Sequence, residues 1–355
     1  MRFAQTGFVT ILSIWGLVAC GGNKDNGEKP VNGTPADSTT LTYVNPVFQP
    51  VLADPTIVQS GDFFYAYGTE DNWGEEGSYH LVPIVKSSNL VNWTFQRDAF
   101  QKKPSWKPQG GIWAPDVTEV DGKFLMYYSF STWGDVNPGI GLAIAEHPEG
   151  PFTDQGKVFD SSEIGVDNSI DPFLRVENGV KWMFWGSFHG IFAVRLTDDG
   201  RHTEGEKVQV AFNHLEGVYV HKRNGFYYLF GSQGTCCEGA NSTYHVRVGR
   251  ATKLLGPYLD KEGNGLLSGN YGELFLQGND AAHGFAGPGH SAEIITDDEG
   301  TDWQMYHAMS KSNAVLSNGT NRRSLMLDKI TWENDWPHIA GRQPSVLRQY
   351  GPVFK

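Results

Sequence analysis

The chain has 355 residues, with 28 Lys and Arg against 40 Asp and Glu, and a formal net charge of −12 at pH 7. This balance argues against a nucleic-acid partner, because phosphate groups need a basic surface, and it favours a neutral ligand over a polyanionic one. The length accommodates one large all-β domain or two ordinary ones, and the 11 Trp, 14 Tyr, 21 Phe and 43 Gly favour β structure with tight turns.

The first 39 residues do not have the composition of a folded domain. Met1-Arg2 provides a positive start, and Phe8–Val18 is an apolar run too short to span a bilayer. The following Leu-Val-Ala-Cys sequence resembles a bacterial lipoprotein signal, in which Cys20 becomes lipidated; an ordinary secretory signal is the alternative. We therefore predict a signal peptide over 1–19 and a flexible tether over 20–39. The protein is expected to be exported and anchored to a bacterial outer membrane, its only membrane contact being the lipidated Cys20.

The region from residue 40 onwards repeats one pattern five times. After a lead-in strand or extended arm at 40–49, an acidic residue or a histidine precedes a strand, a polar turn and an aromatic strand, most cleanly in Ser169–Phe188. The residues that open the five copies are Asp54, Asp116, Asp171, Glu216 and His290. A motif that recurs in this way indicates a repeat architecture.

A second apolar hairpin follows each first one, so each unit contains about four strands. These second hairpins are predicted at 79–95, 139–152, 191–199, 244–259 and 324–339. Sheets that are apolar on both faces need neighbours on both sides, and five such sheets close into a ring. We predict that residues 40–355 form one five-bladed β-propeller, all-β, with four-stranded antiparallel blades around a central channel. The five opening residues should then converge on one end of the axis.

Four carboxylates and an imidazole around one mouth suggest chemistry. An isolated Asp-Pro is more often a turn starter, but the five-fold register makes these acids neighbours. Opposed carboxylates in an aromatic-lined cleft are what glycoside hydrolysis needs, because one acid protonates the leaving oxygen while another activates water or attacks directly.

Two further cysteines, Cys236 and Cys237, are adjacent in the chain. Their Cα atoms lie about 3.8 Å apart, closer than the usual disulfide range, so we expect two structural thiols. A strained vicinal disulfide in an oxidising compartment stays open as the alternative.

Several motifs together resemble glycoside hydrolase family 43. They are Ala53-Asp54-Pro55, Trp113–Asp116, Asn168–Pro172, Glu216-Gly217 and Gly287–His290. Within that family, three segments resemble the endo-α-1,5-L-arabinanases, namely Thr235–Gly239, Ser242–Tyr244 and Val248–Arg250. The resemblance extends from about residue 45 to residue 337.

The resemblance implies a five-bladed propeller and hydrolysis with inversion at the anomeric carbon. Carried onto matching positions, Asp54 is the general base, Glu216 is the general acid, and Asp171 orients Glu216 and raises its pKa. Inversion predicts that the Asp54 and Glu216 carboxyl groups lie about 6.5–9.5 Å apart. Asp116 has no counterpart in this catalytic trio, and we interpret it as structural.

The resemblance also implies a metal and a set of substrate contacts. His290 would help to hold a calcium ion in the central channel, largely through water, although a lone histidine is more often a hydrogen-bonded core residue. Residues expected to contact the sugar are Trp113, Trp133, Gly134, Asn168, Ser187 and Phe188. Inter-blade packing is the alternative role of the three aromatic residues.

The sequence therefore predicts a monomeric endo-arabinanase that cuts α-1,5-arabinan or arabino-oligosaccharides from plant cell walls. An exo-acting α-L-arabinofuranosidase or β-xylosidase is an alternative, to be decided by the shapes of loops 70–80, 99–110 and 268–286. A non-catalytic glycan-binding lipoprotein is a second alternative, which the intact trio disfavours. Val218 stands where the family frequently has Pro, beside the expected acid, so chain-length preference stays open.

Overall fold

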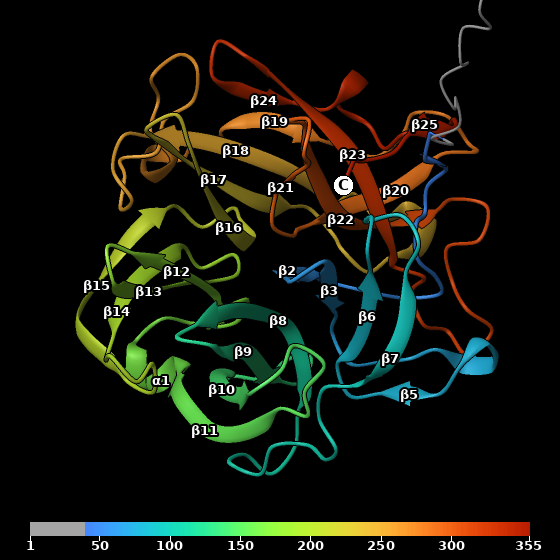
Figure 1. Ribbon diagram of the computed structural model, residues 1–355. Coiled ribbons are helices and arrows are strands. Elements are labelled where there is room, and N and C mark those ends of the chain that lie inside the picture. The colour runs from blue at the N-terminus through green and yellow to red at the C-terminus, as the bar shows by residue number, and fades with distance from the viewer. Residues whose placement is uncertain (1–39) are drawn as a thin grey trace, which may run out of the picture. The chain divides into compact units, whose positions relative to one another are not determined.

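The computed structural model describes residues 40–355, whose main strands form five β-sheets, the blades, arranged around a central axis (Figure 1). The predicted signal peptide and tether, with Cys20, lie outside the described residues. Every sheet is antiparallel and its strands follow one another in chain order, with four strands in blades one to four. The first strands of successive blades contact one another, so they surround the axis, and the predicted five-bladed propeller is confirmed.

The blades begin at β2, β8, β12, β16 and β20. Blade one contains β2 (Thr56–Ser60), β3 (Phe63–Tyr67), β6 (Pro83–Ser87) and β7 (Thr94–Asp98). Blade two contains β8 (Gly111–Val120), β9 (Lys123–Ser131), β10 (Gly139–Ala145) and β11 (Thr153–Asp160). Blade three contains β12 (Phe173–Glu177), β13 (Val180–Trp185), β14 (Ile191–Leu196) and β15 (Thr203–Ala211). Blade four contains β16 (Glu216–Arg223), β17 (Phe226–Gln233), β18 (His245–Ala251) and β19 (Glu273–Leu276). Blade five contains β20 (Phe285–Ser291), β22 (Asp302–Ser310), β23 (Ser324–Glu333) and β24 (Trp336–His338), and β21 (Ile295–Thr296) pairs with β22.

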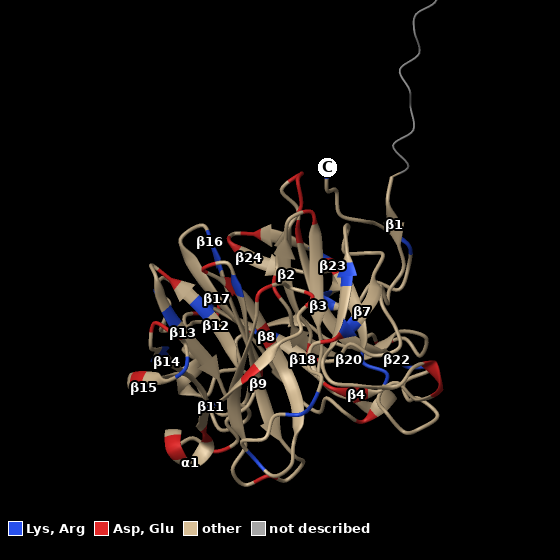
Figure 2. Cartoon of the chain, turned by 60° about the horizontal axis from the view of Figure 1, so that its bottom comes forward, with Lys and Arg blue, Asp and Glu red and all other residues tan. Residues whose placement is uncertain are grey.

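Short elements lie between these strands. They are the hairpin β4 (Asp71–Asn72) and β5 (Tyr79–His80), the helix α1 (Ser161–Ile164) and the 3₁₀ turns η1 (Gly74–Glu76), η2 (Gly239–Asn241), η3 (Leu266–Ser268) and η4 (Ala340–Arg342). Among the described residues, no helix has the length and apolarity needed to cross a bilayer. Lys and Arg, in blue, are scattered over several blades in Figure 2.

Two-residue turns explain why the inner hairpins are recognisable in the sequence. In blades three and four, Asn178-Gly179 and Asn224-Gly225 connect the first two strands, and all four residues have φ between 51° and 80°. Asn and Gly tolerate this left-handed backbone, which matches the twist of a tight hairpin.

The outer strands of blades three and four differ from the prediction. The outermost strand of blade three is Thr203–Ala211 and that of blade four is Glu273–Leu276, beyond the predicted ranges 191–199 and 244–259. Most of Thr203–Ala211 is exposed or half-buried and polar. An outer strand of this kind carries no apolar alternation, so the sequence pattern does not reveal it.

The hydrophobic core lies between blades rather than inside one. One apolar cluster joins Tyr127 of blade two to Met183 and Trp185 of blade three, and equivalent clusters join the other neighbouring blades. Because each sheet buries both of its faces in this way, the blades depend on one another for burial.

The N-terminal arm closes the ring against blade five. β1 (Thr42–Tyr43) pairs with β25 (Gln349–Tyr350), and Phe48 bridges to Leu325 at the start of β23. The side-chain amide of Asn45 accepts from the Leu327 backbone N–H and donates to its carbonyl, both at 2.9 Å. The predicted extended arm at 40–49 therefore serves as a partial outer strand.

Candidate active site

A cavity of about 800 Å³ opens where the connections that precede and follow the inner strands meet. Blades one to four all contribute, and Arg323 comes from the loop before β23. The lining residues include Asp54, Thr69, Glu70, Asp71, Trp113, Ser131, Trp133, Gly134, Asp135, Asn168, Asp171, Ser187, Phe188, Glu216, Cys236, Cys237, Glu238, Tyr244 and Arg323. The predicted catalytic trio and all six predicted substrate contacts are therefore brought together around one space.

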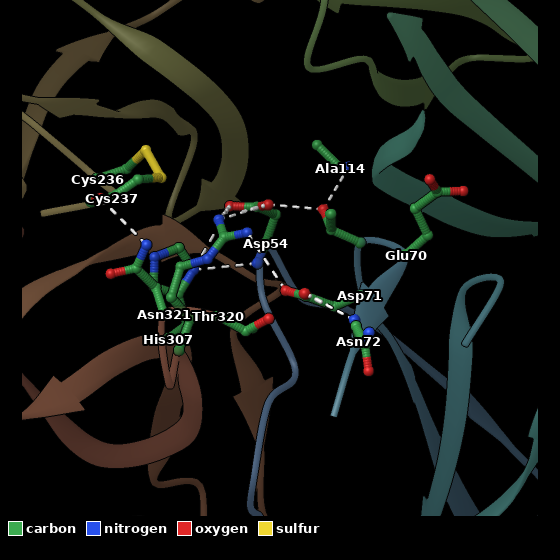
Figure 3. A network of polar contacts seen from close by, with 12 residues as sticks. Asp54, Glu70, Asp71, Asn72, Ala114, Cys236, Cys237, His307, Thr320 and Asn321 are labelled. Carbon is green, nitrogen blue, oxygen red and sulfur yellow. Dashed lines mark hydrogen bonds and ion pairs between the residues drawn. A yellow bond between two sulfur atoms is a disulfide. The ribbon is translucent and has the colours of Figure 1, made fainter. Parts of the chain in front are cut away.

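Asp54 is held by hydrogen bonds to both its carboxylate and its backbone N–H (Figure 3). The Thr69 hydroxyl donates to Asp54 Oδ2 at 2.6 Å, and Arg323 Nη1 donates to both carboxylate oxygens at 3.1 and 3.0 Å. The Asp54 backbone N–H donates to His307 Nδ1 at 3.0 Å. These contacts fix the carboxylate at the cavity wall.

These contacts also keep Asp54 ionised. Burial alone would raise its pKa, but the Arg323 guanidinium holds the pKa of that carboxyl well below its usual range. Burial lowers the pKa of His307 to about 3, so His307 is uncharged at neutral pH. Its Nδ1 accepts a hydrogen bond, so the ring proton lies on Nε2. Arg323 is thus the cation that stabilises the Asp54 charge.

Asp171 and Glu216 have the opposite tendency. Burial raises the pKa of both carboxyls, and the neighbouring Glu216 charge raises that of Asp171 further. Asp171 Oδ2 accepts from the Gly217 backbone N–H at 3.1 Å, which ties it to the residue after Glu216. The Ser187 hydroxyl donates to Glu216 Oε2 at 2.7 Å. The cavity therefore pairs one carboxylate held ionised with two that retain protons more readily.

Asp116 does not belong to this group. It lies inside β8, is not among the cavity-lining residues, and accepts from the Leu174 backbone N–H at 2.7 Å. Its other neighbour is the half-buried Glu293, with which it forms a side-chain hydrogen bond. Convergence of all five opening residues is therefore wrong for Asp116, whose structural interpretation agrees with these contacts.

His290 lies behind Asp54, within β20. Its Nδ1 is 3.9 Å from Asp54 Oδ1, and burial lowers its pKa, so the neutral imidazole keeps a free lone pair on one ring nitrogen. No group of three His, Cys, Asp or Glu within residues 40–355 is placed to hold a metal ion. Ser232 Oγ and Ser291 Oγ are buried without a partner in that region. These residues fit an ion held chiefly by water, not a cage of protein ligands.

The aromatic residues form one wall of the cavity. The Trp113 and Trp133 rings lie 5.8 Å apart and tilted by 45°, and 81% of Trp133 is exposed. Phe188 is 38% exposed. Apolar rings left uncovered beside polar groups are typical of sugar sites, because a sugar ring has both an apolar face and hydroxyls.

Backbone strain concentrates at the same place. The cavity-lining residues with positive φ that are not glycine are Asp54 (50°), Asn168 (50°), Asp171 (58°) and Phe188 (52°), and Ala114 (42°) lies beside Trp113. Left-handed backbone is unfavourable for a bulky residue such as Phe, and it survives where surrounding contacts enforce it. Such clustering is typical of functional sites.

Cys236 and Cys237 form a vicinal disulfide, so the expectation of two free thiols is wrong. Their Cα atoms are 3.8 Å apart, as the chain dictates, but this spacing does not prevent the sulfurs from meeting in a turn. Asn321 Nδ2 donates to the Cys237 carbonyl at 3.1 Å, and the Gly239 N–H donates to Asn321 Oδ1 at 2.8 Å. The disulfide loop therefore forms a fixed wall of the cavity.

Three functional neighbours were not found from the sequence: Thr69, Tyr244 and Arg323. Tyr244 belongs to the segment Ser242–Tyr244 that resembles the arabinanases, but no role was predicted for it. Its hydroxyl lowers the pKa of Glu216 against the effect of burial. Arg323 follows an ordinary polar turn, Asn318-Gly319, and no spacing links it to Asp54, 269 residues away. Only the closed ring brings blades one and five into contact.

The comparisons with known proteins agree with this arrangement. The family described as Glycosyl hydrolases family 43 matches residues 43–337. An extracellular endo-α-(1→5)-L-arabinanase of Bacillus subtilis is 33% identical over 301 residues, covering 81% of this chain and 87% of that protein. An extracellular exo-α-(1→5)-L-arabinofuranosidase of Cellvibrio japonicus is 29% identical over 321 residues, covering 82% and 86%.

A solved structure gives the same result in three dimensions. The α-L-arabinanase of Cellvibrio cellulosa, complexed with arabinohexaose, is similar with a TM-score of 0.70 and 28% identity, covering 82% of this chain and 96% of that one. The match to the family extends over most of the described residues and includes the whole cavity. The chain belongs to glycoside hydrolase family 43.

Proposed function

We propose that this chain is an arabinanase that hydrolyses α-1,5-L-arabinofuranosidic bonds by endo attack, with inversion. The observation that carries the proposal is the meeting of Asp54, Asp171 and Glu216 in one cavity with different protonation tendencies. The Bacillus relative is named as an arabinanase and the Cellvibrio structure is an arabinanase bound to arabinohexaose, which supports arabinan as the substrate.

The chemistry follows from the charge states of these three residues. Ionised Asp54 takes a proton from a water molecule whose oxygen attacks the anomeric carbon. Protonated Glu216 gives its proton to the glycosidic oxygen as the carbon–oxygen bond breaks. Asp171 accepts from the Gly217 N–H and so positions Glu216, while burial and the Asp54 charge keep the pKa of Glu216 raised. Solvent then takes the proton from Asp54 and returns one to Glu216.

The experiment that tests this assignment compares two leaving groups. Glu216→Gln should lower kcat/KM on linear arabinan by about 10²–10⁴-fold, because the leaving oxygen loses its proton donor. An aryl arabinofuranoside with an acidic phenol needs little protonation, so its hydrolysis should fall much less. Equal losses on both substrates would remove Glu216 from the acid role, and a wild-type protein that binds arabinan without cleaving it would support a glycan-binding protein.

Exo attack is the second candidate, favoured by the similarity to the Cellvibrio exo-acting relative. The two modes differ in their first products. Endo attack releases a series of oligosaccharides from debranched arabinan at early times, whereas exo attack releases a product of one size. Chromatographic sizing of the early products on wild-type protein decides between them.

We also propose a calcium ion, held through water, beside the neutral His290 imidazole. The ion would place positive charge near Asp54 and fill the space around the unpartnered serine hydroxyls. A chelator should lower the melting temperature of the wild type, and His290→Ala should be less sensitive to it. Equal melting curves for wild type with and without chelator would contradict the ion.

We also propose that the protein is exported and attached to the membrane by a lipid on Cys20. We propose further that the enzyme is a monomer. The Bacillus and Cellvibrio relatives are both named as extracellular proteins, which supports export. Expression in a bacterium with labelled palmitate should label the wild type but not Cys20→Ser; labelling of neither would contradict the anchor.

A further inference from the structure

One polar cluster at the cavity edge has no part in the trio. It consists of Glu70, Tyr79 and Lys103, which join the hairpin after β3 to the loop before β8. Tyr79 Oη donates to Glu70 Oε1 at 2.6 Å, and Lys103 Nζ donates to the same oxygen at 2.7 Å. Two of the loops expected to shape the cleft, 70–80 and 99–110, are therefore connected across the boundary between blades one and two.

The two oxygens of the Glu70 carboxylate differ sharply. Oε1 accepts both hydrogen bonds of the cluster, whereas Oε2 is buried and has no partner within residues 40–355. Only 5% of the Glu70 side chain is exposed. Lys103 Nζ also donates to the Gly110 carbonyl at 2.8 Å and to the Tyr79 hydroxyl at 3.3 Å, so its three donors are engaged. The cluster therefore retains one unsatisfied acceptor.

The residue that carries this acceptor lines the cavity beside Asp54. Glu70 lines the cavity and directly follows Thr69, whose hydroxyl donates to Asp54. The Glu70 backbone N–H donates to the Ile112 carbonyl at 2.9 Å, which fixes it beside the Trp113 strand. In Figure 3, Glu70 and the disulfide lie on opposite sides of Asp54.

The Trp113 indole shares this space with the Glu70 carboxylate. A Cβ at Gly111 would collide with Trp113 Nε1 and would lie 3.0 Å from Glu70 Oε1. Only glycine therefore lets the ring and the carboxylate approach each other here. An indole whose edge lies near a carboxylate with a free acceptor provides partners for both features of a sugar ring, its apolar face and its hydroxyl donors.

We propose that Glu70 Oε2 accepts a hydrogen bond from a free ring hydroxyl of the arabinofuranose bound against Trp113. This inference rests on the proposed arabinanase activity, and it predicts that linear arabinan is preferred to branched arabinan. A carboxylate can only accept, so a ring whose hydroxyls carry an arabinosyl branch leaves Oε2 unpaired. A site built around a hydroxyl rejects ligands that lack it, because the buried partner is left unsatisfied. Glu70 thus selects linear over branched arabinan.

The test compares Glu70→Gln with wild type on two defined substrates. These are linear α-1,5-arabinopentaose and the same chain with one O3-linked arabinosyl branch. Glutamine keeps an oxygen for Tyr79 and Lys103 but replaces the free acceptor with an N–H donor. The variant should lower kcat/KM on the linear chain about ten-fold or more and change the branched chain little, so the linear-to-branched ratio falls. A parallel fall on both chains, or an unchanged ratio, would overturn the proposal.

Two controls separate this effect from others. Lys103→Met breaks the ion pair but keeps Oε2, so it should retain the wild-type ratio; a ratio lowered as in Glu70→Gln would assign selectivity to the ion pair and contradict the proposal. If wild type cleaves neither chain, the proposed activity fails. Calorimetric titration then still tests the role of Glu70. The proposal requires that Glu70→Gln weaken binding of the linear pentaose more than binding of the branched chain.

Discussion

Asp54 keeps its negative charge in a cavity wall where burial alone would favour the protonated acid. Arg323 and the Thr69 hydroxyl offset that burial. Glu216, in the same cavity, has a raised pKa because burial outweighs its hydrogen bonds to Ser187 and Tyr244. Placing two carboxyls in environments that separate their pKa values is how one site supplies both a base and an acid at one pH.

Ser187 tests this balance at the residue scale. Its hydroxyl stabilises the ionised form of Glu216, so Ser187→Ala should raise the pKa of that acid further. Glu216 must be protonated to act, and the alkaline limb of the kcat/KM profile should therefore move to higher pH. Ser131→Ala is the matched control, because that serine also lines the cavity but donates to the Thr132 carbonyl at 3.3 Å. An alkaline limb that stays in place, or moves down, would contradict the role of Ser187.

The meeting of Asp54, Asp171 and Glu216 in one cavity could be predicted, and the residues that support them could not. All three precede or open the first strand of a blade, but the same register also placed Asp116 with them wrongly, and the resemblance to family 43 was needed to single out the trio. Arg323 lies before the third strand of the last blade, a position with no counterpart in the repeat. Glu70 and the Cys236–Cys237 pairing also depend on loop conformation, which local patterns do not determine.

At the scale of elements, the inner strands are joined by two acids, the buried Asp116 and the half-buried Glu293. Asp116 on β8 accepts from the Leu174 N–H of β12, while Glu293, just after β20, accepts from the Ile57 N–H of β2. The hydrogen bond between the two carboxyls thus connects four blades near the axis. Burial raises the pKa of Glu293 to about 7 and that of Asp116 well above its usual value. The folded pair therefore retains protons that the unfolded chain releases near pH 4–5.

The sign of the pH effect follows from this retention. The folded state binds more protons than the unfolded chain above about pH 4.5, so the free energy of unfolding should fall by at most about 1.4 kcal/mol per pH unit for each retained proton until the pH passes the folded-state pKa. That pKa is about 7 for Glu293 and lies well above the usual value for Asp116. Asp116→Asn keeps an acceptor for Leu174 and a donor for Glu293 without a titrating proton. Urea unfolding at pH 6 and 8.5 should show a smaller decline in this variant, and exposed Asp62→Asn should behave as wild type. A steeper decline in Asp116→Asn would contradict the shared proton.

The inner hairpins could be predicted because they carry aromatic strands and Asn-Gly turns. The outer strands could not, since polar exposed segments such as Thr203–Ala211 pair only because an inner strand offers them an edge. The last strand of blade four, β19, could not be predicted either, because 21 residues separate it from β18 in the sequence. Tertiary context determines these elements, not local propensity.

At the scale of the whole molecule, stability depends on the seam between the first and last blades, where Tyr43 and Asn45 of the arm bond to Leu327 of β23. Asn45→Ala would leave the Leu327 backbone N–H without its partner in a buried environment. We expect the free energy of unfolding to fall by about 2–4 kcal/mol, with kcat on arabinan unchanged, because the seam residues lie outside the cavity lining. Tyr43→Phe removes a single bond to the Leu327 carbonyl and should cost about 1 kcal/mol. Denaturant titration measures both, and a larger loss for Tyr43→Phe would contradict the assignment.

The seam also determines how a mechanical load would travel through the protein. A pull applied at β1 reaches the propeller through the arm, whose hydrogen bonds connect it to β25 and to β23. Arg323 precedes β23, and its carbonyl accepts from the N–H of Leu52, just after the arm, at 2.9 Å. Tension at β1 would therefore reach the residue that holds Asp54 ionised, so the start of the described chain and the Asp54 carboxylate share one mechanical linkage.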